Sequence, residues 1–150
     1  MSSKENKAIA TRWFNAQKTA KIDFATFDDL TASDFVYHNI SQPGVHTHEQ
    51  RKKMLIELNK AFPDIKYTIL DMVAEGDKVA CRYVIRGTHK GEFTGIPPTS
   101  KRIELSSLAI ARVAQGKVAE MWVENNSLVM MLQIGVIPLT AGNFYIKQQG

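Results

Sequence analysis

The chain has 150 residues, of which 44% are hydrophobic and 23% are charged. This composition is ordinary for a globular domain and excludes collagen-like, coiled-coil and disordered classes. The net charge is +4, but the basic residues are scattered along the chain. Their one run, 51–53 (Arg-Lys-Lys), is expected on the solvated face of a helix. A nucleic-acid binder would cluster its basic residues, so nucleic-acid binding is not expected.

Other classes are excluded by what the sequence lacks. No apolar stretch approaches the ~18 residues of a membrane span, and the polar segment 1–7 does not resemble a signal peptide. We therefore expect a cytoplasmic protein without membrane contact. The single cysteine, Cys81, excludes an intramolecular disulfide and a multi-cysteine zinc site. His46 and His48 are expected to be exposed and have no third ligand nearby, so no metal site is expected.

The first half of the chain is expected to be helical. Apolar residues at helical spacing predict a helix over 4–20, and a shorter helix is expected around 24–30. A short extended segment over 35–40 follows. Thr47 and Gln50 have the spacing of a capping box, which predicts the start of a further helix. The apolar residues that this helix should bury are Met54, Leu55, Leu58, Ala61 and Phe62.

The second half is expected to form strands. Residues 65–74, 78–89, 101–114 and 117–126 are rich in β-branched and aromatic residues and are separated by turn signals. Ser127 is a candidate N-cap for a last short helix. Strands joined by turns predict an antiparallel sheet, and helices gathered in the first half predict an α+β fold. A curved sheet wrapped around the early helices would bury the apolar side of both.

A series of short motifs follows along the chain in an order that is specific as a set. They are Phe62–Ile65, Ala74–Val79, Gly87–Phe93, Gly95–Thr99, Gly116–Val118, Glu120 with Trp122, and Leu132–Val136. Together they resemble the SnoaL-like polyketide cyclases, also called ester cyclases. The resemblance implies a cone-shaped α+β fold of the nuclear transport factor 2-like (cystatin-like) superfamily, and a homodimer. It covers a domain over 1–138 and leaves a C-terminal tail over 139–150.

The resemblance also implies a reaction and the residues that it requires. Such cyclases close a ring by an intramolecular aldol condensation and need neither a metal nor an organic cofactor. A base removes a proton from the carbon between two carbonyls, and hydrogen-bond donors hold the enolate oxygen. The family's catalytic aspartate corresponds to Asn126, whose amide cannot accept that proton. A histidine that some cyclases carry on the preceding strand has no counterpart in 109–112.

Glu124 is a candidate to replace the missing aspartate. Side chains alternate along a strand, so Trp122, Glu124 and Asn126 are expected on one face. If Asn126 marks the pocket, Glu124 points into it. We then hypothesise that Glu124 is the general base or acid, with Asn126 and His38 positioning substrate oxygens. The alternative is that Glu124 is a solvent-facing or ion-paired strand residue.

Further residues have both a functional and a structural interpretation. Arg82 could anchor an acidic substrate or pair with Glu104 on a neighbouring strand. Trp13, Tyr37 and Trp122 are candidates for substrate binding, and ordinary packing is the alternative for Trp13.

Two classes of function remain open. The first is a cofactor-independent enzyme that cyclises, isomerises or dehydrates a small apolar carbonyl compound. The second is a non-catalytic module that binds a small hydrophobic ligand. Glu124 separates them: in the enzyme it should lie in a dry pocket, whereas in the binding module it can be exposed or neutralised by Arg82.

Overall fold

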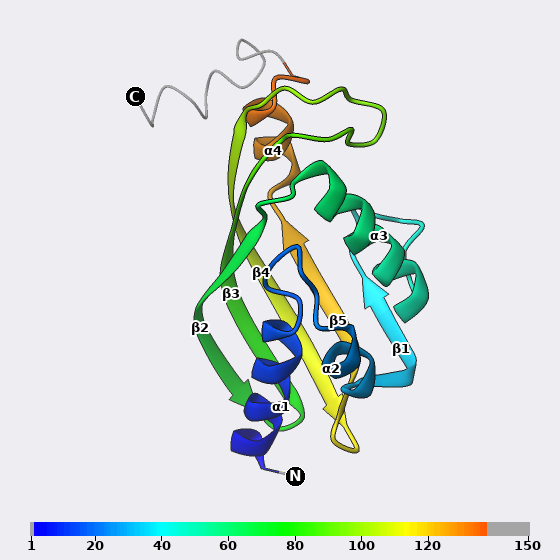
Figure 1. The fold of residues 1–150 in the computed structure, drawn as a ribbon. Helices are drawn as coiled ribbons and strands as arrows, with labels where there is room; N and C mark the ends of the chain where they lie inside the picture. Colours follow the sequence, from blue (N-terminus) through cyan, green and yellow to red (C-terminus); the bar gives the residue numbers. More distant parts are fainter. Residues whose placement is uncertain (1, 138–150) are drawn as a thin grey trace.

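A computed structural model describes residues 2–137 of the chain. In this part the chain forms four helices and five strands (Figure 1). The helices are α1 (Ser3–Asn15), α2 (Phe24–Asp29), α3 (His48–Ala61) and α4 (Ser127–Gln133). The strands are β1 (Thr31–His38), β2 (Lys66–Glu75), β3 (Lys78–Thr88), β4 (Arg102–Ala114) and β5 (Lys117–Asn125). The predicted tail, 139–150, lies outside the described residues.

The strands form one sheet in the order β1-β5-β4-β3-β2. Strands β2 to β5 are antiparallel neighbours, as the turn signals predict. The β4–β5 turn places Gln115 and Gly116 at positive φ, a backbone twist that suits a tight hairpin. The edge strand β1 differs, because it pairs with β5 in parallel. Strands β1 and β5 are far apart in the sequence and no turn joins them. The turn signals could therefore not predict the direction of β1.

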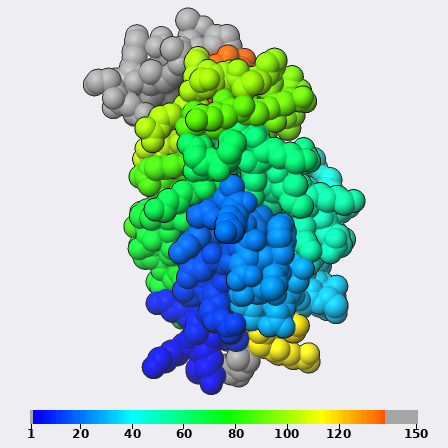
Figure 2. Space-filling view, viewed as in Figure 1, coloured from blue at the N-terminus to red at the C-terminus, as the bar shows by residue number. Residues whose placement is uncertain are grey.

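Helices α1, α2 and α3 lie on one side of the curved sheet, and α4 lies at one end (Figure 1). In the space-filling view, α1 and the segment after it (blue) cover the lower half of that side, and the β3–β4 loop (yellow-green) lies at the upper end (Figure 2). We call the sheet surface that faces the helices the inner face and the opposite surface the outer face. The arrangement is the predicted α+β cone.

Local sequence explains where α1 and α3 begin, and a contact with β2 accompanies the end of α1. Thr47 and Gln50 form the predicted capping box at α3, and Ser2 forms another with Glu5 at α1. Helix α1 is shorter than its apolar pattern predicts, since it ends at Asn15. The residues that follow pair with the start of β2 instead: the Tyr67 amide donates to the Lys18 carbonyl at 2.8 Å.

The core fills the space between the helices and the inner face. Its largest fully buried side chains include Trp13, Phe27, Phe62, Met121 and Ile134. Burial alternates along β4 and β5, so that Met121 and Val123 point inward while Glu124 points outward. No helix within residues 2–137 is long and apolar enough to cross a membrane.

Candidate functional site

Arg51 is a charged side chain buried in the core. It lies in α3 four residues before Leu55, and that spacing puts both on the helix face that packs on the sheet. Only 5% of Arg51 is exposed. The prediction of a solvated helix face for 51–53 is therefore wrong for Arg51, although Lys53 is exposed. A run of basic residues in the sequence does not show which of them lies on the buried face of the helix. That depends on how the helix packs on the sheet.

Aromatic rings surround the Arg51 guanidinium. Its Cζ lies 5.0 Å from the centroid of the Trp13 ring, 5.4 Å from that of Phe27 and 5.3 Å from that of Tyr37. The structure thus brings together two predicted site residues, Trp13 and Tyr37, around a third residue that the sequence did not indicate. Burial lowers the pKa of Arg51, and the nearby Tyr37, Tyr67 and Tyr83 side chains oppose this effect.

A small hollow adjoins the guanidinium. It is lined by Phe14, Gln17, Lys18, Arg51, Tyr67, Ile69, Tyr83 and Met121. Its volume of about 20 Å³ suffices for one water molecule or one small polar group. Burial raises the pKa of Tyr67 to about 12 and also raises that of Tyr83, so both hydroxyls are neutral at physiological pH.

A row of polar side chains crosses the inner face. Tyr83, Ser107 and Asn125 are register partners on β3, β4 and β5, and paired residues project from the same side of a sheet. Ser107 Oγ and Asn125 Oδ1 are buried and have no hydrogen-bond partner among the described residues. The residues predicted from the sequence do not include this row. Met121 and Val123 are apolar and alternate along β5, and this spacing indicates that Asn125, two residues further, also faces inward.

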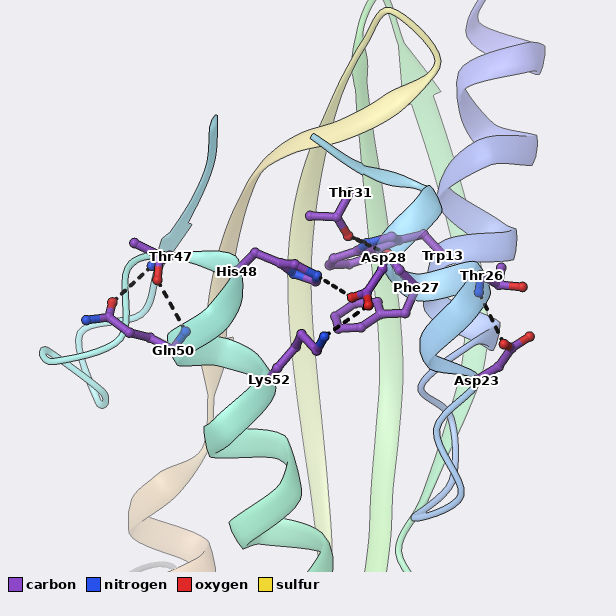
Figure 3. Close-up of polar contacts among 10 residues, drawn as sticks. All are labelled: Trp13, Asp23, Thr26, Phe27, Asp28, Thr31, Thr47, His48, Gln50 and Lys52. Atoms are coloured by element: carbon purple, nitrogen blue, oxygen red, sulfur yellow. Dashed lines mark hydrogen bonds and ion pairs between the residues drawn. The ribbon is translucent and has the colours of Figure 1, made fainter. Parts of the chain in front are cut away.

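Polar contacts join α2 to the start of α3 beside this core (Figure 3). His48 Nε2 lies 2.7 Å from one carboxylate oxygen of Asp28, and Lys52 Nζ lies 2.9 Å from the other. The His48 ring packs on Phe27 with 4.9 Å between centroids. The expectation that both loop histidines are exposed is wrong for His48, whose side chain is 17% exposed, because α2 packs over it. His46 is exposed as predicted.

A large cavity, which we call the loop-end pocket, lies at one end of the cone. It is bounded by residues 41–45, helix α3, residues 91–94 and helix α4, and its volume is about 760 Å³. Its apolar lining consists of Val45, Met54, Leu58, Phe93, Met130 and Met131. Two carboxylates, Glu57 and Glu92, also line it. The size and the mainly apolar lining are those of a small-molecule site.

The predicted catalytic residue Glu124 lies on the outer face and is exposed. It lines a shallow depression of about 450 Å³ together with Asn126, with Leu108 on the neighbouring strand β4 and with Arg82 on β3. Glu124 and Asn126 thus share a depression, as predicted, but Glu124 is exposed there and does not lie in a dry interior pocket. Strand β5 ends at Asn125, and Asn126 turns away to cap α4, its side chain accepting a 3.3 Å hydrogen bond from the Val129 amide. Strand alternation cannot be counted through a residue that has left the strand.

Trp122 and His38 also lie on the outer face. Their rings stack with 5.3 Å between centroids and 9° between planes. His38 Nε2 lies 2.6 Å from Glu120, which also pairs with Arg112 at 3.0 Å. The hydrogen bond from His38 is the main reason that the pKa of Glu120 is lowered. Neither Trp122 nor His38 reaches the interior, so their predicted roles toward an interior substrate do not fit the geometry.

The predicted pairing of the β3 arginines is found in a different arrangement. Arg82 binds Asp71 at 2.9 Å, and it is Arg86 that pairs with Glu104, at 3.2 Å. A bulge at Ile69–Asp71 in β2 sets this choice, since it shifts the register and brings Asp71 opposite Arg82. The Arg82 side chain is half exposed and is already paired with Asp71. It is therefore poorly placed to anchor a substrate in the interior.

The fold and its internal pockets define a member of the nuclear transport factor 2-like class. Within that class the chain belongs to the SnoaL-like polyketide cyclase family, whose model matches residues 8–134. No curated protein matches the chain.

Solved structures show the same likeness. AclR from Streptomyces galilaeus, a proposed hydroxylase, is 27% identical over 91% of this chain and 100% of its own, with a TM-score of 0.79. IdmH from Streptomyces antibioticus, a proposed polyketide cyclase, is 31% identical over 87% of this chain and 98% of its own, with a TM-score of 0.74. A SnoaL-like protein from Jannaschia sp. CCS1, at 23% identity, 91% and 95% coverage and a TM-score of 0.81, shares the fold.

Proposed function

We propose that this protein binds a small, largely apolar, carbonyl-containing compound in the loop-end pocket. The observation that carries the proposal is the cavity of about 760 Å³ between α3, α4 and two loops. Its methionines, Met54, Met130 and Met131, are flexible and suit a ligand of irregular shape. Sequestration of the ligand is the function that the geometry supports best, because none of the buried residues described is an aspartate or a glutamate that could serve as an interior base.

A second candidate is catalysis by proton abstraction in the same pocket. It is favoured by Glu57 and Glu92, which line the rim of the pocket and are exposed; Glu57 is also paired at 3.1 Å with Lys60, which lines the same pocket. Either carboxylate could accept a proton from a carbon between two carbonyls, leading to cyclisation, isomerisation or dehydration. Glu57→Gln and Glu92→Gln distinguish the two functions: in an enzyme one of them abolishes turnover, whereas in a binding module neither changes ligand affinity beyond about threefold.

The binding function is tested by filling the pocket. The probe is 1-phenyl-1,3-butanedione, an apolar 1,3-dicarbonyl compound, titrated by calorimetry into the full chain. Met131→Trp should weaken its binding at least tenfold, because the larger ring occupies the cavity. Leu128→Trp is the matched control, since Leu128 lies on the same helix, is 45% exposed and does not line the pocket. Equal binding by the wild type and Met131→Trp would contradict the proposal.

We also propose that two copies of the chain pair through the outer face. A register row crosses all five strands and contains Val73, Ala80, Ile110, Trp122 and His38. Val73 is 69% exposed and Ile110 41% exposed, and Leu108 beside them is 58% exposed. Exposed apolar side chains in one continuous patch favour association. Charged pairs flank the row, which suits a self-complementary contact.

A cytoplasmic location is part of the same proposal. Its support is Cys81, a buried free thiol on the inner face of β3. Burial raises the pKa of this thiol to about 11, so it is an unreactive core residue rather than a disulfide partner.

A further inference from the structure

The Arg51 guanidinium lacks the partner that a buried cation normally has. Its Nε and Nη1 atoms are buried without a hydrogen-bond partner, and no ion pair among residues 2–137 includes it. Arginine does not lose its proton in proteins. A buried charge of this kind is costly unless something compensates it. The rings of Trp13, Phe27 and Tyr37 attract the charge, and the Tyr37 side chain also hydrogen-bonds to the guanidinium, but Nε and Nη1 still lack an acceptor.

The hollow beside Arg51 has the chemistry of an anion site. Its lining contains two cations, Arg51 and Lys18, and no carboxylate. The neutral hydroxyls of Tyr67 and Tyr83 add hydrogen-bond donors. Lys18 is exposed, so the hollow borders the surface where α1 ends and β2 begins. The volume of about 20 Å³ fits one small polar group.

We propose that this hollow binds the carboxylate of a small monocarboxylic acid, with Arg51 as the principal ligand. A carboxylate is flat and small, and its two oxygens accept charge-assisted hydrogen bonds from guanidinium N–H groups. A phosphate group is bulkier and is a poorer match to the volume. Phe14 and Ile69 line the same hollow, which at about 20 Å³ admits the carboxylate only, so the hydrocarbon part of the acid extends toward the exposed end beside Lys18. The site is separate from the loop-end pocket and goes beyond the proposed function.

Nuclear magnetic resonance on the full chain tests the proposal directly. The probe is sodium acetate, compared with acetamide, its neutral isostere, at constant ionic strength and a pH of about 7. The Nε–Hε resonance of Arg51, assigned with Arg51→Lys, should shift saturably with acetate. We expect acetate to bind at least tenfold more tightly than acetamide. Equal affinities, or an Arg51 resonance that does not move, would overturn the proposal.

Variants separate a binding role from a structural one. Arg51→Leu should lose the preference for acetate and keep or raise the melting temperature, since replacing an unpaired buried charge with an apolar side chain relieves its cost. Arg86→Leu removes one positive charge from the outer face and should leave the preference unchanged. A folded Arg51→Leu that still prefers acetate tenfold would contradict the assignment. If Arg51→Leu does not fold, the wild-type resonance decides.

Met131→Trp keeps this test independent of the loop-end pocket. It should block the dicarbonyl probe and leave the acetate response of Arg51 intact, because Met131 does not line the hollow. Loss of both responses in a folded Met131→Trp would show that acetate binds in the loop-end pocket, and the Arg51 site would be rejected.

Discussion

The indole nitrogen of Trp13 donates a 2.8 Å hydrogen bond to Thr31 Oγ1, and this buried contact ties α1 to the first residue of β1 (Figure 3). Thr31 in turn donates to the Phe27 carbonyl at 2.6 Å. The rings of Trp13 and Phe27 both pack on the Arg51 guanidinium. One threonine hydroxyl thus fixes two of the three rings that enclose the buried charge.

Thr31→Val should destabilise the protein by about 1–3 kcal/mol, because it leaves the buried Trp13 N–H without an acceptor. Urea unfolding measures the change in the free energy of unfolding. Thr31→Ser keeps the hydroxyl and should retain most of the stability. Ser33→Ala, an exposed change on the same strand, is the control. Equal losses for the Val and Ser variants would show that the hydrogen bond contributes little.

Asp64 should make stability depend on pH. Its two carboxylate oxygens accept hydrogen bonds of 2.7 Å from the Thr88 amide and hydroxyl, and the Thr88 hydroxyl is the main cause of its lowered pKa. A folded-state pKa below the unfolded value of 3.8 means that this stabilisation is complete above the unfolded pKa. It is lost as the pH falls through the lower, folded-state pKa.

The measurement is the melting temperature of the wild type and of Asp64→Asn from a pH of about 7 down to about 2.5. The difference between them should be largest at neutral pH and shrink in acid, as the wild-type carboxylate becomes protonated. Asp34→Asn, a change at an exposed position on β1, is the control. A difference that stays constant with pH would contradict a role for the ionised Asp64 carboxylate.

Ile110→Lys should convert a dimer into a monomer. Ile110 stands at the centre of the outer-face row, and a lysine there would place two like charges in the contact. Sedimentation velocity gives the oligomeric state, and the melting temperature checks that the variant is folded. Ile40→Lys is the control, because Ile40 is 88% exposed outside the sheet. A wild type that sediments as a monomer would refute pairing through this face.

Asn126→Asp should restore a carboxylate at the position of the family's catalytic aspartate. Asp caps helices as well as Asn does and adds about 0.3–1 kcal/mol from the helix dipole, so the fold should tolerate it. Asn126 itself lines the depression that it shares with Glu124, and it directly precedes Ser127, which lines the loop-end pocket. We expect the variant to accelerate deuterium exchange of 1-phenyl-1,3-butanedione over the wild type, as followed by NMR.

Glu124→Gln is the matched comparison for that experiment. Glu124 lines the same depression as Asn126 but is exposed to solvent, so we expect its replacement to change neither exchange nor ligand binding. A loss of exchange in Glu124→Gln would restore it as a catalytic candidate. An exchange rate in Asn126→Asp equal to that of the wild type would mean that a carboxylate at this position is not sufficient for proton abstraction.

The sequence by itself determined most of the elements and the family, although α1 ends earlier and β1 begins earlier than predicted. The capping box at Thr47 and Gln50, the turn at Gln115 and Gly116 and the alternation within each strand are local signals, because each depends on residues a few positions apart. The ordered motifs along the chain added the cone-shaped fold.

Only the tertiary structure decided which side chains face the interior. Glu124 was expected in a dry pocket beside Asn126, whereas the structure places both on an open depression where the chain leaves β5 and turns into α4. Arg51 was placed by its charge, although the docking of α3 on the sheet buries it among aromatic rings. The direction of β1 and the pairing of Arg82 with Asp71 depend on contacts between distant segments. Such contacts form only when whole helices and strands pack together, so a short stretch of sequence does not predict them.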